Sequence, residues 1–442
     1  MMQTLAVIGG GVSGTFVVLN CLKQAHTALE IIWFDGAGLF CKGLAYSTEE
    51  EVHLLNVRAS NMSVFADEPA HFLNWLQANN HPFTGNHFVP RKLYGAYVLD
   101  TFHQMKDKNP FVKIIQKTEE VIAVSFQENH YTLSAKETYT VNTVVLAVGN
   151  FLPAHPRSAA DAFTKSKNYF QNAFAGEAMS KICTLESVTI FGAGLTMIDV
   201  VLALKHRNYK GHITIISPHG YLPQPHHSNL QATESFIDPK ASYTLMEVFR
   251  LVNRQLKKAK RENANPHNVI DALRPYIQTL WLNFSIEDKQ QFLRHLRHKW
   301  GVARHRAPLE SINVINELML NSQLTVLKGR ISNIEEGADG FEIVYADRTS
   351  KSNTLSTRAI VNCTGPESDF HKIESGLIKH LISSGLIEGH ELHYGIKASK
   401  TGQIAKNLFT IGPPLKGVLW ESTAVPEIRV QAAEITAKII FD

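Results

Sequence analysis

Two glycine-rich turns are the parts of this sequence whose residue types and spacing can do chemistry. The first occupies residues 9–14 (GGGVSG) and the second residues 192–197 (GAGLTM); each follows a short apolar run and precedes a helical pattern. Glycines in such a turn let a pyrophosphate approach the backbone, and the positive end of the following helix attracts its charge. Two such turns in one chain predict two bound dinucleotides and electron transfer between a nicotinamide and a flavin.

The first turn has the full G-x-G-x-x-G spacing. Gly9 is expected to permit the tight turn, Gly11 to leave room for the pyrophosphate, and Gly14 to let helix and strand pack closely. Asp35 ends the next apolar run, where a carboxylate accepts hydrogen bonds from an adenosine ribose. FAD is the expected cofactor here, because a second dinucleotide site lies downstream. The other predicted binding residues of this turn are Val12 and Ser13.

The second turn is less regular, because Met197 stands where the third glycine is expected. The strand behind it ends at Ser217 instead of at an acid, so no carboxylate there would repel a 2′-phosphate. The pattern favours NADPH and leaves NADH open, and a turn with a purely structural role stays an alternative. The residues predicted to bind the nicotinamide cofactor are Gly192, Gly194, Leu195, Thr196 and Ser217.

A strand-rich stretch follows each turn and ends in a matched phrase, at residues 144–149 (VVLAVG) and 360–365 (IVNCTG). This internal repeat predicts that Gly149 and Gly365 let the backbone pass beneath a cofactor. A plain strand-end glycine explains either copy taken alone. The agreement between the two copies is what favours a functional role.

The C-terminal block has a further expected role at the flavin. Gly412 ends the predicted last strand of the FAD domain, and an amphipathic helix begins at Ala424 and Val425. If this helix points its positive end at the isoalloxazine ring, it stabilises the reduced, anionic flavin. A helix that only closes the domain is the alternative.

These patterns predict an α/β fold with two Rossmann-like dinucleotide-binding domains, β-meanders and a helical insertion. The FAD-binding domain is expected in two parts, residues 1–175 and 371–442, with the NAD(P)-binding domain at 176–370 between them. A mainly helical pattern at about 229–321 marks the insertion, which would cover the nicotinamide side or join two subunits of a homo-oligomer. Its basic segments at 294–300 and 304–308 are expected either to bind an anion or to lie on the surface or in an interface.

Composition narrows the classes of function. A formal charge of +4 in 442 residues predicts neither a nucleic-acid partner nor a membrane surface. The four cysteines are scattered without a C-x-x-C pair, which argues against a dithiol relay and predicts a reduced, cytoplasmic protein. The histidine pairs lack the acids or cysteines that would complete a ligand set, so no metal is expected. No signal peptide and no membrane span is expected either.

The chain resembles a bacterial FAD/NAD(P)-binding flavoprotein family that includes flavin-dependent amino-acid N-monooxygenases, such as aspartate N-oxygenases. The resemblance covers nearly the whole chain and is carried by several phrases in the order of that family. These are GLAY at 43–46, HLLNV at 53–57, NMS at 61–63, FVPRKLYG at 88–95, GLTMID at 194–199, RHRAP at 304–308, NCTGP at 362–366 and WESTAVPEIR at 420–429.

This resemblance implies an FAD-dependent, NAD(P)H-consuming monooxygenase that hydroxylates a small amine or amino acid with molecular oxygen, through a flavin C4a-hydroperoxide. Two alternatives stay open: an NAD(P)H:acceptor reductase or dehydrogenase without oxygen insertion, and a non-catalytic nucleotide-sensing protein. Arg91 is expected to bind a cofactor phosphate or a substrate carboxylate. The predicted reaction chamber consists of Asn56, Tyr46, Met62 and Ser63.

One departure from the family concerns the second nucleotide. Similar sequences often carry arginines directly after the serine at the position of Ser217, where this chain has Pro218 and His219. The choice between NADPH and NADH therefore stays open at this point.

Overall fold

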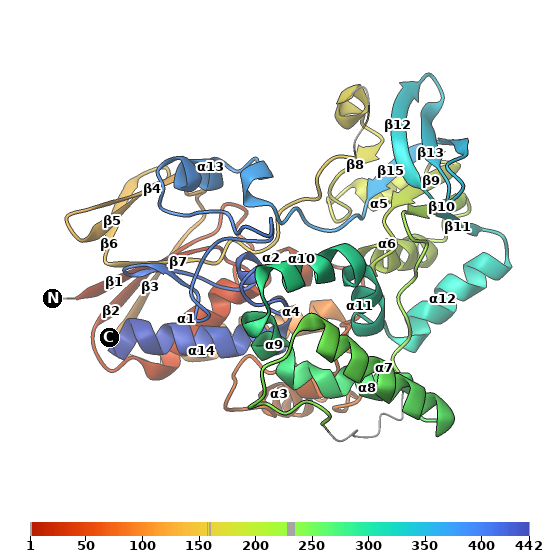
Figure 1. Cartoon of the computed structure of the whole chain (residues 1–442). Helices are drawn as coiled ribbons and strands as arrows, with labels where there is room; N and C mark the ends of the chain where they lie inside the picture. The colour runs from red at the N-terminus through yellow and green to blue at the C-terminus, as the bar shows by residue number, and fades with distance from the viewer. Residues whose placement is uncertain (1, 157, 159–160, 228–234, 442) are drawn as a thin grey trace.

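Two sheets form the centre of the protein. The computed structural model describes residues 2–156, 158, 161–227 and 235–441 (Figure 1). The first sheet lies at the left of Figure 1 and the second at the right, with the green helices of the insertion between and below them. A segment of the predicted insertion, residues 228–234, lies outside the described residues.

The first sheet has the strand order β16-β17-β7-β1-β2-β3 and is parallel except for the β16–β17 pair. Its central strands are near-continuous apolar runs, as expected of parallel strands that are buried on both faces. Leu5 and Val7 of β1 face one hydrophobic core, while Ala6 and Ile8 face another. The strands are β1 (Gln3–Ile8), β2 (Leu29–Phe34), β3 (Val112–Lys117), β7 (Thr143–Leu146), β16 (Gln403–Ala405) and β17 (Leu408–Thr410).

Different layers cover the two faces of this sheet. On one face, α1 packs on α4 and on the C-terminal helix α14. On the other face lie the antiparallel sheet β4-β5-β6 and α13. The bounds are α1 (Val12–Gln24), α4 (Arg91–Lys106), α13 (Gly376–Ser383), α14 (Val425–Phe441), β4 (Ala123–Gln127), β5 (His130–Ser134) and β6 (Thr138–Val141).

The second sheet has the order β11-β10-β9-β15-β8, and all its pairs are parallel. Helices α6 and α12 share a core with one face, and the antiparallel sheet β12-β13-β14 packs on the other. The bounds are β8 (Tyr169–Phe170), β9 (Ser187–Phe191), β10 (His212–Ser217), β11 (Leu324–Lys328), β12 (Arg330–Gly337), β13 (Gly340–Ala346), β14 (Ser352–Thr357), β15 (Ala359–Asn362), α6 (Leu195–His206) and α12 (Leu309–Leu320).

The two sheets repeat one arrangement, in which the first strand of each unit lies between the second strand and the strand that ends the meander. The Gly9 N–H donates to Phe34 O at 2.9 Å, and the Gly192 N–H donates to Ile216 O at 2.9 Å. The predicted α/β fold with its internal repeat is therefore confirmed. The predicted domain limits stay a prediction; β8 precedes residue 176 but belongs to the second sheet, whereas β16 and β17 follow residue 371 and belong to the first.

The insertion is a group of short helices that packs on the segment leading into α14. The rings of Trp281 and Trp420 are tilted against each other with centroids 4.9 Å apart, and Trp281 Nε1 donates to Gly417 O at 2.8 Å. The helical pattern of the insertion is interrupted at the short turn that contains Pro275 and again at Leu296. The helices are α7 (Leu245–Arg261), α8 (Pro266–Leu273), α9 (Ile277–Asn283), α10 (Ile286–His295) and α11 (Arg297–Arg304).

Shorter elements complete the chain. No helix within the described ranges is long and apolar enough to cross a bilayer. The remaining helices are α2 (Gly43–Tyr46), α3 (His71–Ala78), α5 (Ala178–Ile182) and the 3₁₀ turns η1 (Ala59–Asn61), η2 (Asp161–Lys165), η3 (Arg274–Tyr276), η4 (Phe370–Lys372) and η5 (Pro413–Leu415).

The two glycines of the second turn are expected to differ sharply in their tolerance of a side chain. Gly192 has φ +95° and a Cβ there would lie 2.3 Å from Cys363 O, whereas a Cβ at Gly194 would meet no atom within 4 Å. Gly192→Ala is expected to lower the free energy of unfolding by about 1–3 kcal/mol, and Gly194→Ala to leave it nearly unchanged. Urea unfolding followed by circular dichroism measures both. Equal stability of the two variants would contradict this close approach.

Candidate functional site

A cavity of about 490 Å³ lies where the two units meet. Its volume is within the range of about 300–1,000 Å³ that is usual for ligand pockets. The walls come from the first turn, from the loop after β2, from the segments after β7 and β15, and from the starts of α6 and α14. Both glycine-rich turns therefore contribute to one cavity.

The first turn forms one wall of this cavity. Gly9, Gly11, Val12 and Ser13 line it. A Cβ placed at Gly11 would make one ordinary contact, with Gly43 Cα at 3.7 Å, so a larger group still has room in front of that residue. Gly14 lies behind the turn, where a Cβ would be 2.1 Å from Gly9 O, and this contact explains the close packing of α1 on β1.

The start of α1 is available to an anion. Gly11 is the N-cap residue and makes no side-chain capping hydrogen bond, so the first N–H groups of the helix have no side-chain partner at this end. Asp35 also lines the cavity, but its carboxylate already holds the loop. Its Oδ2 accepts from Gly10 N at 2.9 Å, and its Oδ1 accepts from Ala37 N at 3.1 Å and Leu39 N at 2.9 Å. One acceptor position of Oδ2 remains for a ribose hydroxyl.

The two matched phrases open toward the same cavity. Gly149 has φ +67° and Gly365 has φ +96°, and a Cβ at either position would meet nothing within 4 Å. Both residues line the cavity. Left-handed backbone next to open space is what a glycine beneath a flat cofactor requires.

The second turn contributes fewer residues. Leu195 and Thr196 line the cavity, whereas Gly192 and Gly194 are not among its lining residues. Ser217 is buried at the end of β10, where its Oγ accepts from Gly220 N at 3.1 Å. Met197 is fully buried in the core between α6 and the second sheet, so its side chain fills the space that a third glycine would leave.

The C-terminal segment closes the cavity beside the first turn. Val425 lines it, and Ala424 begins the last helix by accepting from Ile428 N at 2.9 Å. Gly412 lies behind the wall with φ +77°; its N–H donates to Gln431 Oε1 at 2.9 Å, and a Cβ there would be 2.8 Å from Ser13 Oγ. Gly412 therefore lets α14 approach α1 and does not itself line the cavity.

The residues of the predicted chamber lie at different places. Tyr46 lines the cavity, with its ring centroid 4.8 Å from that of Tyr94. Burial raises the pKa of Tyr46 to about 12, so its phenol stays protonated at neutral pH. Asn56 does not line the cavity; its carbonyl oxygen is 3.0 Å from His226 Nε2 of the loop after β10.

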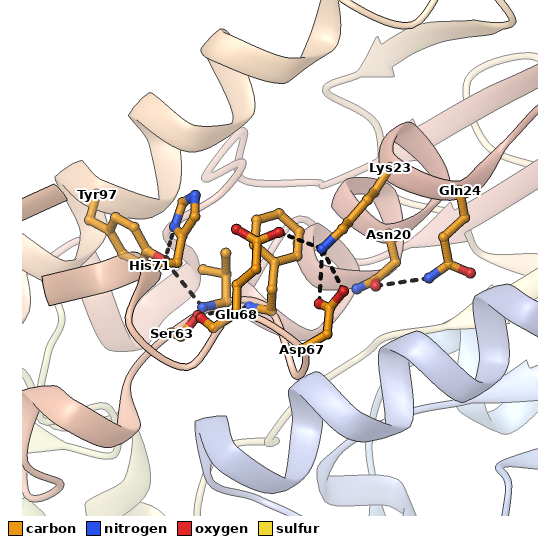
Figure 2. A network of polar contacts seen from close by, with 10 residues as sticks. Asn20, Lys23, Gln24, Ser63, Asp67, Glu68, His71 and Tyr97 are labelled. Carbon is orange, nitrogen blue, oxygen red and sulfur yellow. Dashed lines mark hydrogen bonds and ion pairs between the residues drawn. The ribbon is translucent and has the colours of Figure 1, made fainter. Parts of the chain in front are cut away.

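Met62 and Ser63 lie away from the cavity, in the core beneath α4. Figure 2 shows Ser63 within a polar network that includes Glu68, His71 and Tyr97. The Ser63 Oγ donates to Glu68 O at 2.6 Å, and His71 Nδ1 is 2.7 Å from the Tyr97 hydroxyl. These contacts, with the hydrogen bond from Val64 N to the Tyr97 hydroxyl, tie the segment to α3 and α4.

Arg91 has a partner that the sequence analysis missed. Its guanidinium forms a two-pronged ion pair with Asp199 of α6, at 2.8 Å from Nη1 to Oδ2 and 3.3 Å from Nη2 to Oδ1, and its Nε donates to Leu54 O at 3.1 Å. Burial raises the pKa of Asp199, and the nearby Arg91 charge opposes that rise. Both residues line the cavity. The pair joins the first unit to the second. In the sequence, the one indication of such a buried partner is Asp199, an acid among the apolar residues at the start of α6.

A family model described as FAD-NAD(P)-binding matches residues 6–151, a range that holds the first turn and Asp35. A sequence search of curated proteins finds no match. Solved structures, in contrast, match along almost the whole chain.

An ornithine N-hydroxylase from Kutzneria sp. 744, solved with reduced FAD, NADP⁺ and L-ornithine, is 14% identical, with 99% of each chain covered and a TM-score of 0.66. The FAD-bound cadaverine monooxygenase from Erwinia amylovora is 13% identical, with 99% of this chain and 94% of that chain covered and a TM-score of 0.67. A bacillithiol disulfide reductase from Bacillus cereus is 11% identical, with 100% of this chain and 99% of that chain covered and a TM-score of 0.56. These TM-scores over almost the whole chain establish the fold. The chain has the two-dinucleotide-binding flavoprotein fold that the sequence predicts.

The Arg91–Asp199 pair is expected to be strongly coupled. Arg91→Met leaves the buried Asp199 carboxylate without a counter-charge and should cost about 3–5 kcal/mol of unfolding free energy. The double variant Arg91→Met/Asp199→Leu removes both charges and should recover most of that loss. Lys92→Met is the matched control, because the Lys92 ion pair with Glu49 is exposed; its stability should change little. A double-mutant cycle in urea measures the coupling, and additive effects would show that the two residues act independently.

Proposed function

We propose that this protein is an FAD-dependent, NAD(P)H-consuming monooxygenase that hydroxylates the nitrogen of a small amine or amino acid. The observation that carries the proposal is the single cavity to which both glycine-rich turns contribute. The full-length likeness to N-hydroxylating enzymes for ornithine and cadaverine supports it. The reaction consumes one NAD(P)H, one proton and one oxygen molecule for each amine; one oxygen atom enters the N–O bond and the other leaves as water.

The flavin end of the proposed site rests on the first turn. Open space at Gly11, and at Gly149 beyond it, fits a pyrophosphate and the flat ring system of FAD. The uncapped start of α1 would hold the pyrophosphate, and Asp35 would bind the ribose through its free acceptor position. When bound, FAD supplies hydride acceptance from NAD(P)H and the activation of oxygen.

The nicotinamide end rests on the start of α6. Gly194 is the N-cap residue of that helix and, like Gly11, makes no side-chain capping hydrogen bond. The helix start would bind the second pyrophosphate, with Leu195 and Thr196 toward the flavin. The open space at Gly365 would let the nicotinamide lie close to the flavin ring. Gly192 supports this wall from behind.

The remaining predicted residues divide into a chamber and its supports. Tyr46 is proposed to face the reacting atoms as a protonated hydrogen-bond donor. Asn56 is proposed to hold the loop through its contact with His226, and Met62 and Ser63 are proposed to support the loop from the core. Arg91 is assigned to the link with Asp199, because that carboxylate already compensates its charge. Gly412, Ala424 and Val425 would bring the positive end of α14 to the flavin.

The cysteines favour oxygenation over a dithiol relay. All four cysteines are free. Cys363 is the cysteine that lines the cavity, and burial raises the pKa of its thiol well above the ordinary value. Burial raises the pKa of Cys21 and Cys41 to about 12. Neutral, unpaired thiols do not perform thiol–disulfide exchange. Free thiols also support the proposed cytoplasmic location.

The activity is tested on the purified protein in three steps. The absorption spectrum of the protein, as purified and after incubation with FAD, reports flavin binding. Oxidation of NADPH and NADH is then followed with oxygen and a panel of amino acids and diamines, and mass spectrometry detects products that have gained one oxygen atom. A protein that binds no flavin would overturn the proposal. Rapid turnover of quinones or dyes without any hydroxylated amine would establish the reductase alternative instead.

Flavin retention is expected to depend on the open space at Gly11. Gly11→Leu should fill the space in front of the first turn and lower bound FAD at least tenfold, without unfolding the protein. Gly376→Leu is the matched control, because a Cβ at that glycine meets no atom within 4 Å and the residue lies at the start of α13, away from the cavity. The flavin-to-protein absorbance ratio after desalting measures retention. Normal retention in Gly11→Leu would contradict the assignment of the first turn.

A further inference from the structure

A cluster of positively charged side chains lies near the end of β10. These side chains do not come from the residues directly after that strand. We call it the basic cluster. It comes from three separate segments: the junction of β11 and β12, the turn between β13 and β14, and the start of α11. Its members are Lys328, Arg330, Arg348 and Arg297, and each lies near enough to His219 to lower its pKa.

Strand pairing places the first members of the basic cluster beside Ser217. Ser217 pairs with Lys328 in the parallel ladder of β10 and β11, and its carbonyl accepts from Gly329 N at 3.0 Å. A Cβ at Gly220 would lie 3.2 Å from Lys328 Cβ. Arg330 begins β12 opposite Ala346, the last residue of β13, so the turn that carries Arg348 lies next to it.

Ring systems lie beside the charges. The imidazole centroids of His219 and His298 are 4.3 Å apart, and Tyr221 stacks on His219 with centroids 5.6 Å apart and an angle of 11° between the planes. Arg297 Nη2 lies 3.0 Å from His298 Nε2. Flat aromatic faces next to cations are a suitable surface for a purine base.

The cations of the basic cluster are not held in ion pairs. None of its four cations forms an ion pair with an acid in the part of the chain that the structure describes. Asp347, in the same turn as Arg348, uses its Oδ1 for Thr349 and for Lys351 N at 3.1 Å. Partial burial lowers the pKa of His219, and all four cations lower it further. An anionic ligand would relieve this repulsion.

In a dinucleotide-binding unit, the end of the second strand faces the adenosine ribose. A carboxylate there binds the 2′-hydroxyl of NAD, whereas a cation accommodates the 2′-phosphate of NADP. Asp35 holds this position in the first unit and Ser217 holds it in the second. We propose that the basic cluster binds the ribose 2′-phosphate of NADPH, with the adenine against the rings of His219 and Tyr221, and that it makes the protein prefer NADPH to NADH.

This inference rests on the proposed function only in that the second turn binds a nicotinamide dinucleotide. The phosphate would receive hydrogen bonds from guanidinium and ammonium groups, each of which contributes more than a neutral donor does. Because these cations lie outside the segment after Ser217, the absence of arginines at Pro218 and His219 does not remove the phosphate site.

The test compares two adenosine nucleotides by isothermal titration calorimetry on the flavin-loaded protein. Adenosine 2′,5′-bisphosphate should bind at least tenfold more tightly than adenosine 5′-monophosphate, which lacks the 2′-phosphate. The double variant Lys328→Ala/Arg330→Ala should remove most of this preference, and Arg348→Ala should weaken it about three- to tenfold. Lys351→Ala, in the same turn but outside the basic cluster, should leave it unchanged. In steady-state kinetics the double variant should raise KM for NADPH about tenfold, with kcat and the KM for NADH nearly constant.

Equal binding of the two nucleotides by the unaltered protein would overturn the inference, and so would a preference that survives in Lys328→Ala/Arg330→Ala. Inorganic phosphate is the third ligand; displacement of the bisphosphate by an equal concentration of phosphate would reveal a nonspecific anion site and would also overturn it. Circular dichroism of each variant checks folding. These titrations require neither amine hydroxylation nor oxygen, so failure of the proposed function leaves their outcome readable.

Discussion

Close backbone approach at two strand ends is the constraint on which both nucleotide units depend. A Cβ at Gly9 would lie 2.2 Å from Ala147 O, and a Cβ at Gly192 would lie 2.3 Å from Cys363 O. Each turn can therefore follow its strand only if the residue is glycine with a positive φ. This contact brings the start of the next helix to the edge of the sheet, where its free N–H groups open into the shared cavity. Loss of either glycine would move a helix, and the cavity wall would move with it.

The ion pair between Arg91 and Asp199 adds a second constraint, which acts between the units. Arg91 is the first residue of α4 in the first unit, and Asp199 lies in α6, the helix that follows the second glycine-rich turn. Both line the cavity. Because the pair is largely buried, separating the charges would leave each without compensation in a medium of low polarity. The pair thus holds the start of α4 against α6, and both residues belong to the cavity wall. Hydride transfer between two cofactors needs such a fixed separation.

Local patterns predicted the elements well, whereas the residues of the predicted chamber lie in different surroundings. The apolar run before Asp35 forms β2 and the one before the second turn forms β9, because apolar runs and glycine turns are encoded by neighbouring residues. Pro275 lies in the turn that separates α8 from α9, so the helical periodicity of the insertion does not mark where each helix ends. Met62 shares a loop with Tyr46 but lies in the core, since sequence proximity within an irregular loop does not determine which side chains face a cavity. The partner of Arg91 depends on packing between units, which no local pattern records.

The end of β10 separates two statements that sequence motifs tend to merge. A strand end without an acid permits a 2′-phosphate, and that much is visible at Ser217. A site that can admit the 2′-phosphate does not yet prefer NADPH to NADH. That preference requires positive charge near the phosphate, and charge acts through space over distances of about 10 Å. Here Lys328 and Arg330 arrive through strand pairing, while Arg297 and Arg348 arrive from an inserted helix and a hairpin turn. At the proposed site, cofactor preference therefore depends on residues from several segments. A motif limited to the residues directly after the strand does not include them.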